Sequence, residues 1–130
     1  MYYASGGEGM TRPERMCLMD FDSDLTRSTV EPIVLRLVSE RPMYGYEIIK
    51  VVNERTEGAF EWKEGTLYPC LHRLEGAGLV KARWRDSEGG RRRKYYAVTR
   101  KGAALLKKKV EEWGAFTAAA NALLFGTAGA

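Results

Sequence analysis

The stretch VKARWRDSEGGRRRKYYAV, residues 80–98, decides the fold because it contains two alternating segments joined by a turn-forming loop. From Val80 to Arg85, one set of alternate side chains is apolar or aromatic and the other is basic, as in a half-exposed β-strand. The second segment runs from Arg91 to Val98, after the loop Asp86-Ser87-Glu88-Gly89-Gly90. The stretch therefore predicts a β-hairpin with strongly basic strands.

The charge of the chain is concentrated around this hairpin. The formal net charge is +4, but residues 79–101 contain nine basic and two acidic side chains, a net charge of +7. Residues 1–31 contain three basic and six acidic side chains, a net charge of −3. Trp84, Tyr95 and Tyr96 lie between the basic residues, and this mixture is typical of a surface that binds a polyanion. A solvated charged hairpin without a partner is the alternative.

Three helices are predicted before the hairpin, because apolar residues recur there at helical spacing. Thr26 or Ser28 is expected to cap the first, and Pro42 cannot continue it beyond about residue 40. The second is predicted over about residues 44–55 and the third over about 65–76. In the third helix, Pro69 is expected in or near the first turn, where its missing N–H has no partner to lose.

Two further helices are predicted outside this region. Residues 11–14, TRPE, have the pattern of a capping box and predict a short helix that ends near Phe21. An acidic connector is expected over residues 20–24. After the hairpin, Thr99 is expected to cap a long last helix over about residues 100–124.

Three short helices, a two-stranded hairpin and a long final helix follow one another in the order of a winged helix-turn-helix. The fold class is therefore mainly α with a small β-hairpin, that is, α+β. The expected organisation is an N-terminal extension over residues 1–25, a DNA-binding domain over 26–98, a dimerisation helix over 99–125 and a frayed tail over 126–130.

The third helix is the candidate for reading DNA. With its leucines on the buried face, a period of 3.6 places Pro69, His72 and Arg73 on the opposite side. A major groove admits a helix, and the N-terminal half of such a helix reaches the base edges. Arg73 and His72 are donors to guanine or phosphate, and Thr66 and Tyr68 on the flanks offer hydroxyl groups. The alternative is an exposed side chain without a partner or, for Tyr68, packing against the second helix.

The hairpin is expected to project as a wing that follows a phosphate backbone. Its basic residues alternate in direction, so at most two of three consecutive ones point the same way. Pairing with Asp86 or Glu88 is the alternative for some of them. The candidate phosphate contacts are Arg91, Arg92, Arg93 and Lys94.

Several separated motifs occur in an order that resembles the PadR family of transcriptional regulators, over about Val30 to Trp113. The motifs are PMYGYE at 42–47, EGTLYP at 64–69, LHRLE at 71–75, GLV at 78–80, GRRRKYY at 90–96 and TRKG at 99–102. The resemblance implies a winged-helix repressor of phenolic-stress or multidrug-resistance genes that acts as a homodimer. It also implies that the helix containing Thr66 to Arg73 reads DNA and that Arg91 to Lys94 form the wing.

The chain departs from the family pattern in its N-terminal extension before Asp24 and in its short C-terminal part. Only one helix is predicted after the wing, which resembles the shorter subfamily and leaves effector binding open.

The last helix carries an apolar seam with alternating spacings of four and three, as in a coiled coil. Leu105, Phe116 and Leu123 widen this face beyond what a lone helix hides, which predicts a partner helix from a second copy. Such a homodimer matches a pseudo-palindromic double-stranded DNA operator. The seam residues are Leu106, Val110, Trp113, Thr117, Ala120 and Leu124.

Trp113 has a second interpretation. The family resemblance implies that an aromatic residue on this helix stacks a flat ligand inside the dimer. Trp113 is therefore a candidate contact for a small planar aromatic effector, and an ordinary interface tryptophan is the alternative.

Other functional classes lack support in the sequence. No Gly-rich phosphate loop, metal-ligand spacing or nucleophile–base arrangement occurs, so we expect no enzyme activity, cofactor or metal. Cys17 and Cys70 lie far apart, which disfavours a disulfide framework and fits a reducing cytoplasm. No apolar run approaches 18 residues and no secretory signal begins the chain, so no membrane partner is expected. The alternatives to a DNA-binding regulator are a winged helix that docks a partner protein and a drug-sequestering sensor with weak DNA binding.

Overall fold

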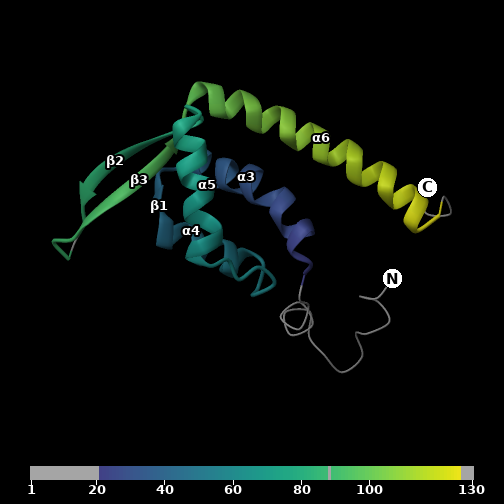
Figure 1. The fold of residues 1–130 in the computed structure, drawn as a ribbon, viewed down its shortest axis with the longest axis horizontal. Helices are drawn as coiled ribbons and strands as arrows, with labels where there is room; N and C mark the ends of the chain where they lie inside the picture. The colour runs from purple at the N-terminus through teal and green to yellow at the C-terminus, as the bar shows by residue number, and fades with distance from the viewer. Residues whose placement is uncertain (1–20, 88, 127–130) are drawn as a thin grey trace.

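The computed structural model describes residues 21–87 and 89–126, and it has the predicted α+β architecture (Figure 1). The predicted helix over residues 11–21 lies outside the described residues except for Phe21, and so does all of the tail but Gly126. The elements in chain order are α3 (Ser23–Glu40), β1 (Met43–Tyr44), α4 (Gly45–Arg55), α5 (Glu64–Gly76), β2 (Val80–Asp86), β3 (Arg92–Val98) and α6 (Arg100–Leu124).

Helix α3 begins earlier than predicted, because Asp22 and not Thr26 or Ser28 caps it. The Asp22 side chain accepts a hydrogen bond of 2.8 Å from the Asp24 N–H. The hydroxyls of Thr26 and Ser28 instead donate to backbone carbonyls of the preceding turn. Residues 22–24 of the expected acidic connector therefore form a helix start, where the negative charge of Asp24 is favourable beside the helix N-terminus.

The hairpin belongs to a three-stranded sheet of order β1-β3-β2, so the prediction of a two-stranded hairpin is incomplete. Met43 pairs with Tyr96 and Tyr44 pairs with Tyr95, while β2 and β3 pair from Val80↔Val98 to Asp86↔Arg92. A strand of two residues is too short for its alternation to be recognised in a sequence. This strand ties the start of α4 to the sheet.

The sheet has two different faces. Its inner face carries Met43, Ala82 and Tyr96 and packs against the helices, while its outer face carries Tyr44, Arg83 and Tyr95. The hairpin extends beyond the helices in Figure 1, so its outer half has no core beneath it. We call this outer half, residues 84–94, the wing. The side chains buried most completely are Leu35, Met43, Ile48, Leu67, Leu71, Leu74, Val34, Val38, Val80 and Cys70.

Helix α6 is joined tightly to the turn that ends α5. The Thr99 hydroxyl caps α6 as predicted, accepting from the Gly102 N–H at 3.0 Å, and it donates to the Gly78 carbonyl at 2.7 Å. A Cβ atom added to Gly102 would lie 2.0 Å from the Leu79 carbonyl oxygen, so only glycine fits there. From this joint α6 runs past α3, and its C-terminal half lies beyond the other helices (Figure 1).

Candidate nucleic-acid interface

The exposed face of α5 holds all five residues that the sequence suggested for reading DNA. The opposite face is buried by Leu67, Leu71 and Leu74, as the helical period predicted. Pro69 is the sixth residue of the helix and not in its first turn, so the helix lacks one internal hydrogen bond, the one to the Gly65 carbonyl. The exposed residues are Thr66, Tyr68, Pro69, His72 and Arg73.

Tyr68 is both exposed and packed against the second helix of the motif. Its side chain covers Gly45 so closely that a Cβ atom there would lie 2.3 Å from the phenol oxygen. Nevertheless, 42% of Tyr68 remains exposed. Partial burial, together with the charge of Glu64, raises the pKa of the Tyr68 phenol. Tyr68 is therefore a neutral side chain that packs on Gly45 and keeps part of its surface at the solvent.

Arg73 lies on the side of α5 that faces α3. Its Nη2 atom is 3.8 Å from Oε2 of Glu31, and most of the Arg73 side chain is exposed. An ion pair this long at the surface contributes little to stability. The guanidinium can therefore leave Glu31 for a base or a phosphate at small cost.

The four basic residues proposed for the wing have different surroundings. Lys94 is engaged within the protein: its Nζ atom donates to Glu75 of α5 at 3.2 Å, and this hydrogen bond raises the Lys94 pKa. Arg91 is exposed in the loop, beyond the last pair of the ladder, Asp86↔Arg92. Lys94 thus connects the wing to α5, whereas Arg91 has no ion-pair partner among residues 21–87 and 89–126.

Arg92 and Arg93 lie on opposite faces of the wing. Arg92 is on the inner face, 3.8 Å from Asp86 and 5.7 Å from the centre of the Trp84 ring. Arg93 is on the outer face, with its guanidinium 4.4 Å from the centre of the Tyr44 ring. Because successive side chains of a strand alternate, Arg92 and Arg93 leave β3 on opposite faces.

A hollow of about 640 Å³ lies between the wing and the start of α4 and α5. Tyr46, Tyr68, Trp84 and Arg92 are among the residues that line it. The sequence did not single out Tyr46, and it named Trp84 only as one of the aromatic residues between the basic ones. The alternation of residues 80–85 does place Trp84 with the apolar set, but that side becomes solvent-exposed where the wing leaves the core. The hollow joins the exposed face of α5 to the inner face of the wing.

The seam of α6 divides into a buried start and an exposed remainder. Leu106 belongs to the core of its own chain, with 7% of its surface exposed, so it has little left for a partner. Leu106 is therefore a core residue of its own chain and not part of an exposed dimer surface, because the start of α6 packs on α3. Further along, Val110, Trp113, Phe116 and Leu124 are exposed, while Thr117 and Ala120 are partly buried.

An apolar groove of about 460 Å³ runs between α3, the end of α4 and α6. Ile33, Val52 and Phe60 line its base, and Val110 and Trp113 line it from α6. Trp113 is 46% exposed, and its ring lies 6.5 Å from that of Phe116. The groove continues the exposed apolar face of α6.

Within residues 21–87 and 89–126, no group of His, Cys, Asp or Glu side chains is arranged to hold a metal ion. The helices of this part include none that is long and apolar enough to cross a membrane. Cys70 is buried as a free thiol, and its burial raises its pKa to about 11. This thiol is accordingly protonated and unreactive at neutral pH.

Known proteins resemble this chain in sequence. The Transcriptional regulator PadR-like family matches residues 34–108. The chain is 42% identical over 91 residues to an uncharacterised protein X of Lysinibacillus sphaericus, which covers 70% of the chain and 84% of that protein. It is 32% identical over 80 residues to the transcriptional regulator YqjI of Escherichia coli, which covers 62% of the chain but 37% of YqjI.

Solved structures resemble it in fold. A transcriptional regulator of Clostridium thermocellum has a TM-score of 0.74 and 36% identity, over 81% of this chain and 99% of the other. A PadR-like transcriptional regulator of Bacillus cereus has a TM-score of 0.71 and 32% identity, over 80% and 99%. The resemblance seen in the separated motifs is thus confirmed, and the chain belongs to the PadR-like family of transcriptional regulators.

Proposed function

We propose that this chain is a sequence-specific DNA-binding repressor that acts as a homodimer and responds to a small planar aromatic effector. The observation that carries the proposal is the continuous surface formed by the exposed face of α5 and the basic wing. Helix α5 has the size and polarity to enter a major groove, where His72 and Arg73 donate to base edges or phosphates. Thr66 and Tyr68 add hydroxyl donors on the flanks.

The wing supplies contacts that do not depend on sequence. Arg91 and Arg92 are best placed for the phosphate backbone that passes between the wing and α5, because Lys94 is already bound to Glu75. The exposed aromatic rings of Trp84 and Tyr46 border the same hollow. Phosphate contacts of this kind give affinity and orientation, while α5 gives specificity.

The apolar surface of α6 supports the homodimer. A helix of 25 residues is about 37 Å long, and its second half exposes large apolar side chains that one chain cannot cover. Pairing with α6 of a second copy buries them and repeats α5 about a two-fold axis. Two such helices match half-sites about one DNA turn, roughly 34 Å, apart.

We propose Trp113 as the effector contact, because it lines the apolar groove between α3, α4 and α6. A flat aromatic compound that stacks on Trp113 competes with the packing of α6. It weakens DNA binding only if it prefers the dimer geometry that fits the operator less well.

A binding assay tests the proposal. Fluorescence anisotropy is measured with a duplex from the DNA upstream of the chain's own gene and with a random duplex of equal length, at about 50 to 200 mM salt. We expect a preference for the upstream duplex and an affinity that falls steeply with salt, by orders of magnitude if six or more phosphates are contacted. Equal affinity for both duplexes, or no binding to either, contradicts the proposal and favours a winged helix that docks a protein.

A further inference from the structure

The outer face of the wing, which points away from α5, is as basic as the inner face. Arg85 of β2 and Arg93 of β3 lie directly opposite each other on it. Like charges in directly opposed positions of an antiparallel pair destabilise it. Among the described residues, no carboxylate lies within ion-pair distance of either guanidinium. The sheet therefore holds two adjacent positive charges that these residues do not neutralise.

Two tyrosine rings hold these arginines in place. The Arg85 guanidinium carbon lies 4.0 Å from the centre of the Tyr95 ring, and that of Arg93 lies 4.4 Å from the centre of the Tyr44 ring. The rings themselves meet edge to face, with their centres 5.3 Å apart. Stacking fixes each guanidinium by its face and leaves its N–H groups at the edge available. The arginines are thus ordered before any ligand arrives.

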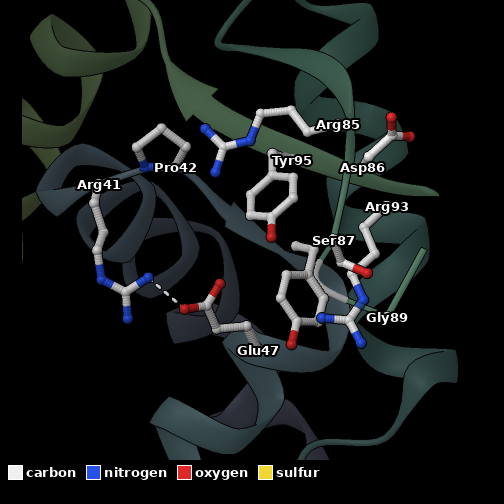
Figure 2. A pocket seen from close by; sticks show the side chains of 10 residues that line it. Arg41, Pro42, Glu47, Arg85, Asp86, Ser87, Gly89, Arg93 and Tyr95 are labelled. Atoms are coloured by element: carbon white, nitrogen blue, oxygen red, sulfur yellow. Dashed lines mark hydrogen bonds and ion pairs between the residues drawn. The ribbon is translucent and has the colours of Figure 1, made fainter. Parts of the chain in front are cut away.

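The two arginines border a hollow of about 720 Å³. In Figure 2, Arg85, Tyr95 and Arg93 line this space, and the ion pair of Arg41 with Glu47 lies at its margin. Arg41 is bound to Glu47, and Asp86, which also lines the hollow, lies 3.8 Å from Arg92. Among the described lining residues, Arg85 and Arg93 are therefore the cations left to meet a ligand there. Arg83 follows on the same strand face and extends the positive charge.

We propose that this hollow is a second phosphate-binding site, in which Arg85 and Arg93 hold a phosphodiester group of DNA. Planar guanidinium groups match the oxygens of a phosphate with paired N–H donors, and an anion between them relieves their mutual repulsion. The inference rests on the proposed function, since it requires the wing to approach DNA. The inner face then meets one strand through Arg92, and the outer face meets the other strand.

Salt dependence gives the first test. The variant Arg85→Gln/Arg93→Gln is compared with Lys107→Gln/Lys108→Gln, which removes two exposed charges from α6, far from the wing. Each lost phosphate contact lowers the slope of log K against log salt by about 0.9. With one phosphate per wing in a dimer, the slope of the outer-face variant falls by about 2 and that of the control stays unchanged. Arg85→Lys/Arg93→Lys keeps the charges and is expected to keep the slope.

Neutral methylphosphonate groups placed singly along each strand identify the phosphate. At the contacted position, the neutral group weakens binding of the natural protein but has no further effect on Arg85→Gln/Arg93→Gln. In the variant Arg92→Gln, the methylphosphonate position that no longer weakens binding is expected on the opposite DNA strand. If no position loses its effect in the outer-face variant, the inference is overturned. Circular dichroism and thermal unfolding verify that the variants fold.

The remaining outcomes separate this inference from the proposed function. If the natural protein does not prefer its upstream duplex, the proposed function fails. If it does, but the outer-face variant keeps the full salt slope, only the second phosphate site fails. Replacing chloride by inorganic phosphate at constant ionic strength tests for a free anion. If DNA occupies the pair, phosphate competes with DNA more strongly in the natural protein than in the variant. If phosphate binds at the pair but does not weaken DNA binding in the natural protein, the assignment to a DNA strand is overturned.

Discussion

Helices α5 and α6 both present a long exposed face, but the two faces differ in chemistry. Helix α5 buries all its leucines and exposes polar residues such as His72 and Arg73. Helix α6 buries Leu106 near its start and then exposes Trp113 and Phe116. Exposed polar side chains are well solvated by water, whereas a large exposed apolar face favours association with another molecule. One helix thus suits a hydrated ligand such as DNA, and the other suits a second protein chain.

A substitution at the joint between α5 and α6 is expected to have the largest effect, and that effect is on the stability of the fold. Gly102→Ala forces a Cβ atom against the Leu79 carbonyl and should lower the free energy of unfolding by about 3 kcal/mol or prevent folding. Gly114→Ala is the matched control in the same helix, because nothing lies within 4 Å of a Cβ atom there. It should stabilise α6 by up to about 1 kcal/mol. Urea unfolding compares the two, and equal stability would contradict the tight joint.

The apolar face of α6 is tested by Phe116→Gln/Leu124→Gln. We expect monomers in sedimentation experiments and operator affinity lower by about 100-fold, because each half-site is then bound without the gain from a linked second one. The preference among DNA sequences should persist, since α5 is untouched. Lys108→Gln/Glu112→Gln is the control on exposed polar positions of the same helix. A variant that stays dimeric would place the interface elsewhere.

The polar face of α5 is tested by Arg73→Ala. It should cost about 1–3 kcal/mol on the operator and relax the preference at one position of each half-site, without changing the dimer. Arg92→Ala should instead weaken all duplexes alike. Anisotropy titrations on operator and random DNA measure both. If Arg73→Ala leaves the ratio of the two affinities unchanged, Arg73 does not read bases.

The smallest effect expected is that of an effector on the α6 side. A planar aromatic compound should quench Trp113 fluorescence and lower the affinity for DNA by about tenfold, or about 1.4 kcal/mol. DNA should lower the affinity for the compound by the same factor. Because Trp62 and Trp84 also fluoresce, the quenching counts only if Trp113→Ala abolishes it. If Trp113→Ala dimerises, binds DNA and responds as before, Trp113 is not the ligand contact.

The sequence predicted the long periodic elements better than the short ones. Helices α5 and α6 are close to their predicted bounds, because several turns of apolar spacing and the Thr99 cap define them. Strand β1 has two residues, so its pairing with β3 depends on the tertiary structure and cannot be predicted from the local sequence. The start of α3 was misplaced because Asp22 competed with Thr26 and Ser28, and all three are good caps.

In the candidate site, too, some features could be predicted from the sequence and others could not. The period of α5 was enough to predict which of its residues are exposed. Strand alternation predicted that the wing arginines diverge, but not where each goes. That Lys94 meets Glu75 and that Arg93 stacks on Tyr44 depends on how β3 crosses α5 and β1, over separations of 19 residues and more. Such partners cannot be derived from local sequence.

The turn at residues 77–79 accepts three hydrogen bonds from the start of α6, two from Thr99 and one from the Lys101 ammonium group. These hydrogen bonds hold the start of α6 against the end of α5, so the two helices are expected to tilt together. A tilt of about 10° at one end of a 37 Å lever moves the other end by about 6 Å, nearly two base-pair steps of 3.4 Å. In the proposed homodimer, the angle at which the two copies of α6 cross therefore sets the distance between the half-sites that the dimer fits. If the proposed dimer is correct, substitutions along α6 are expected to change the preferred half-site spacing without altering α5 or the wing.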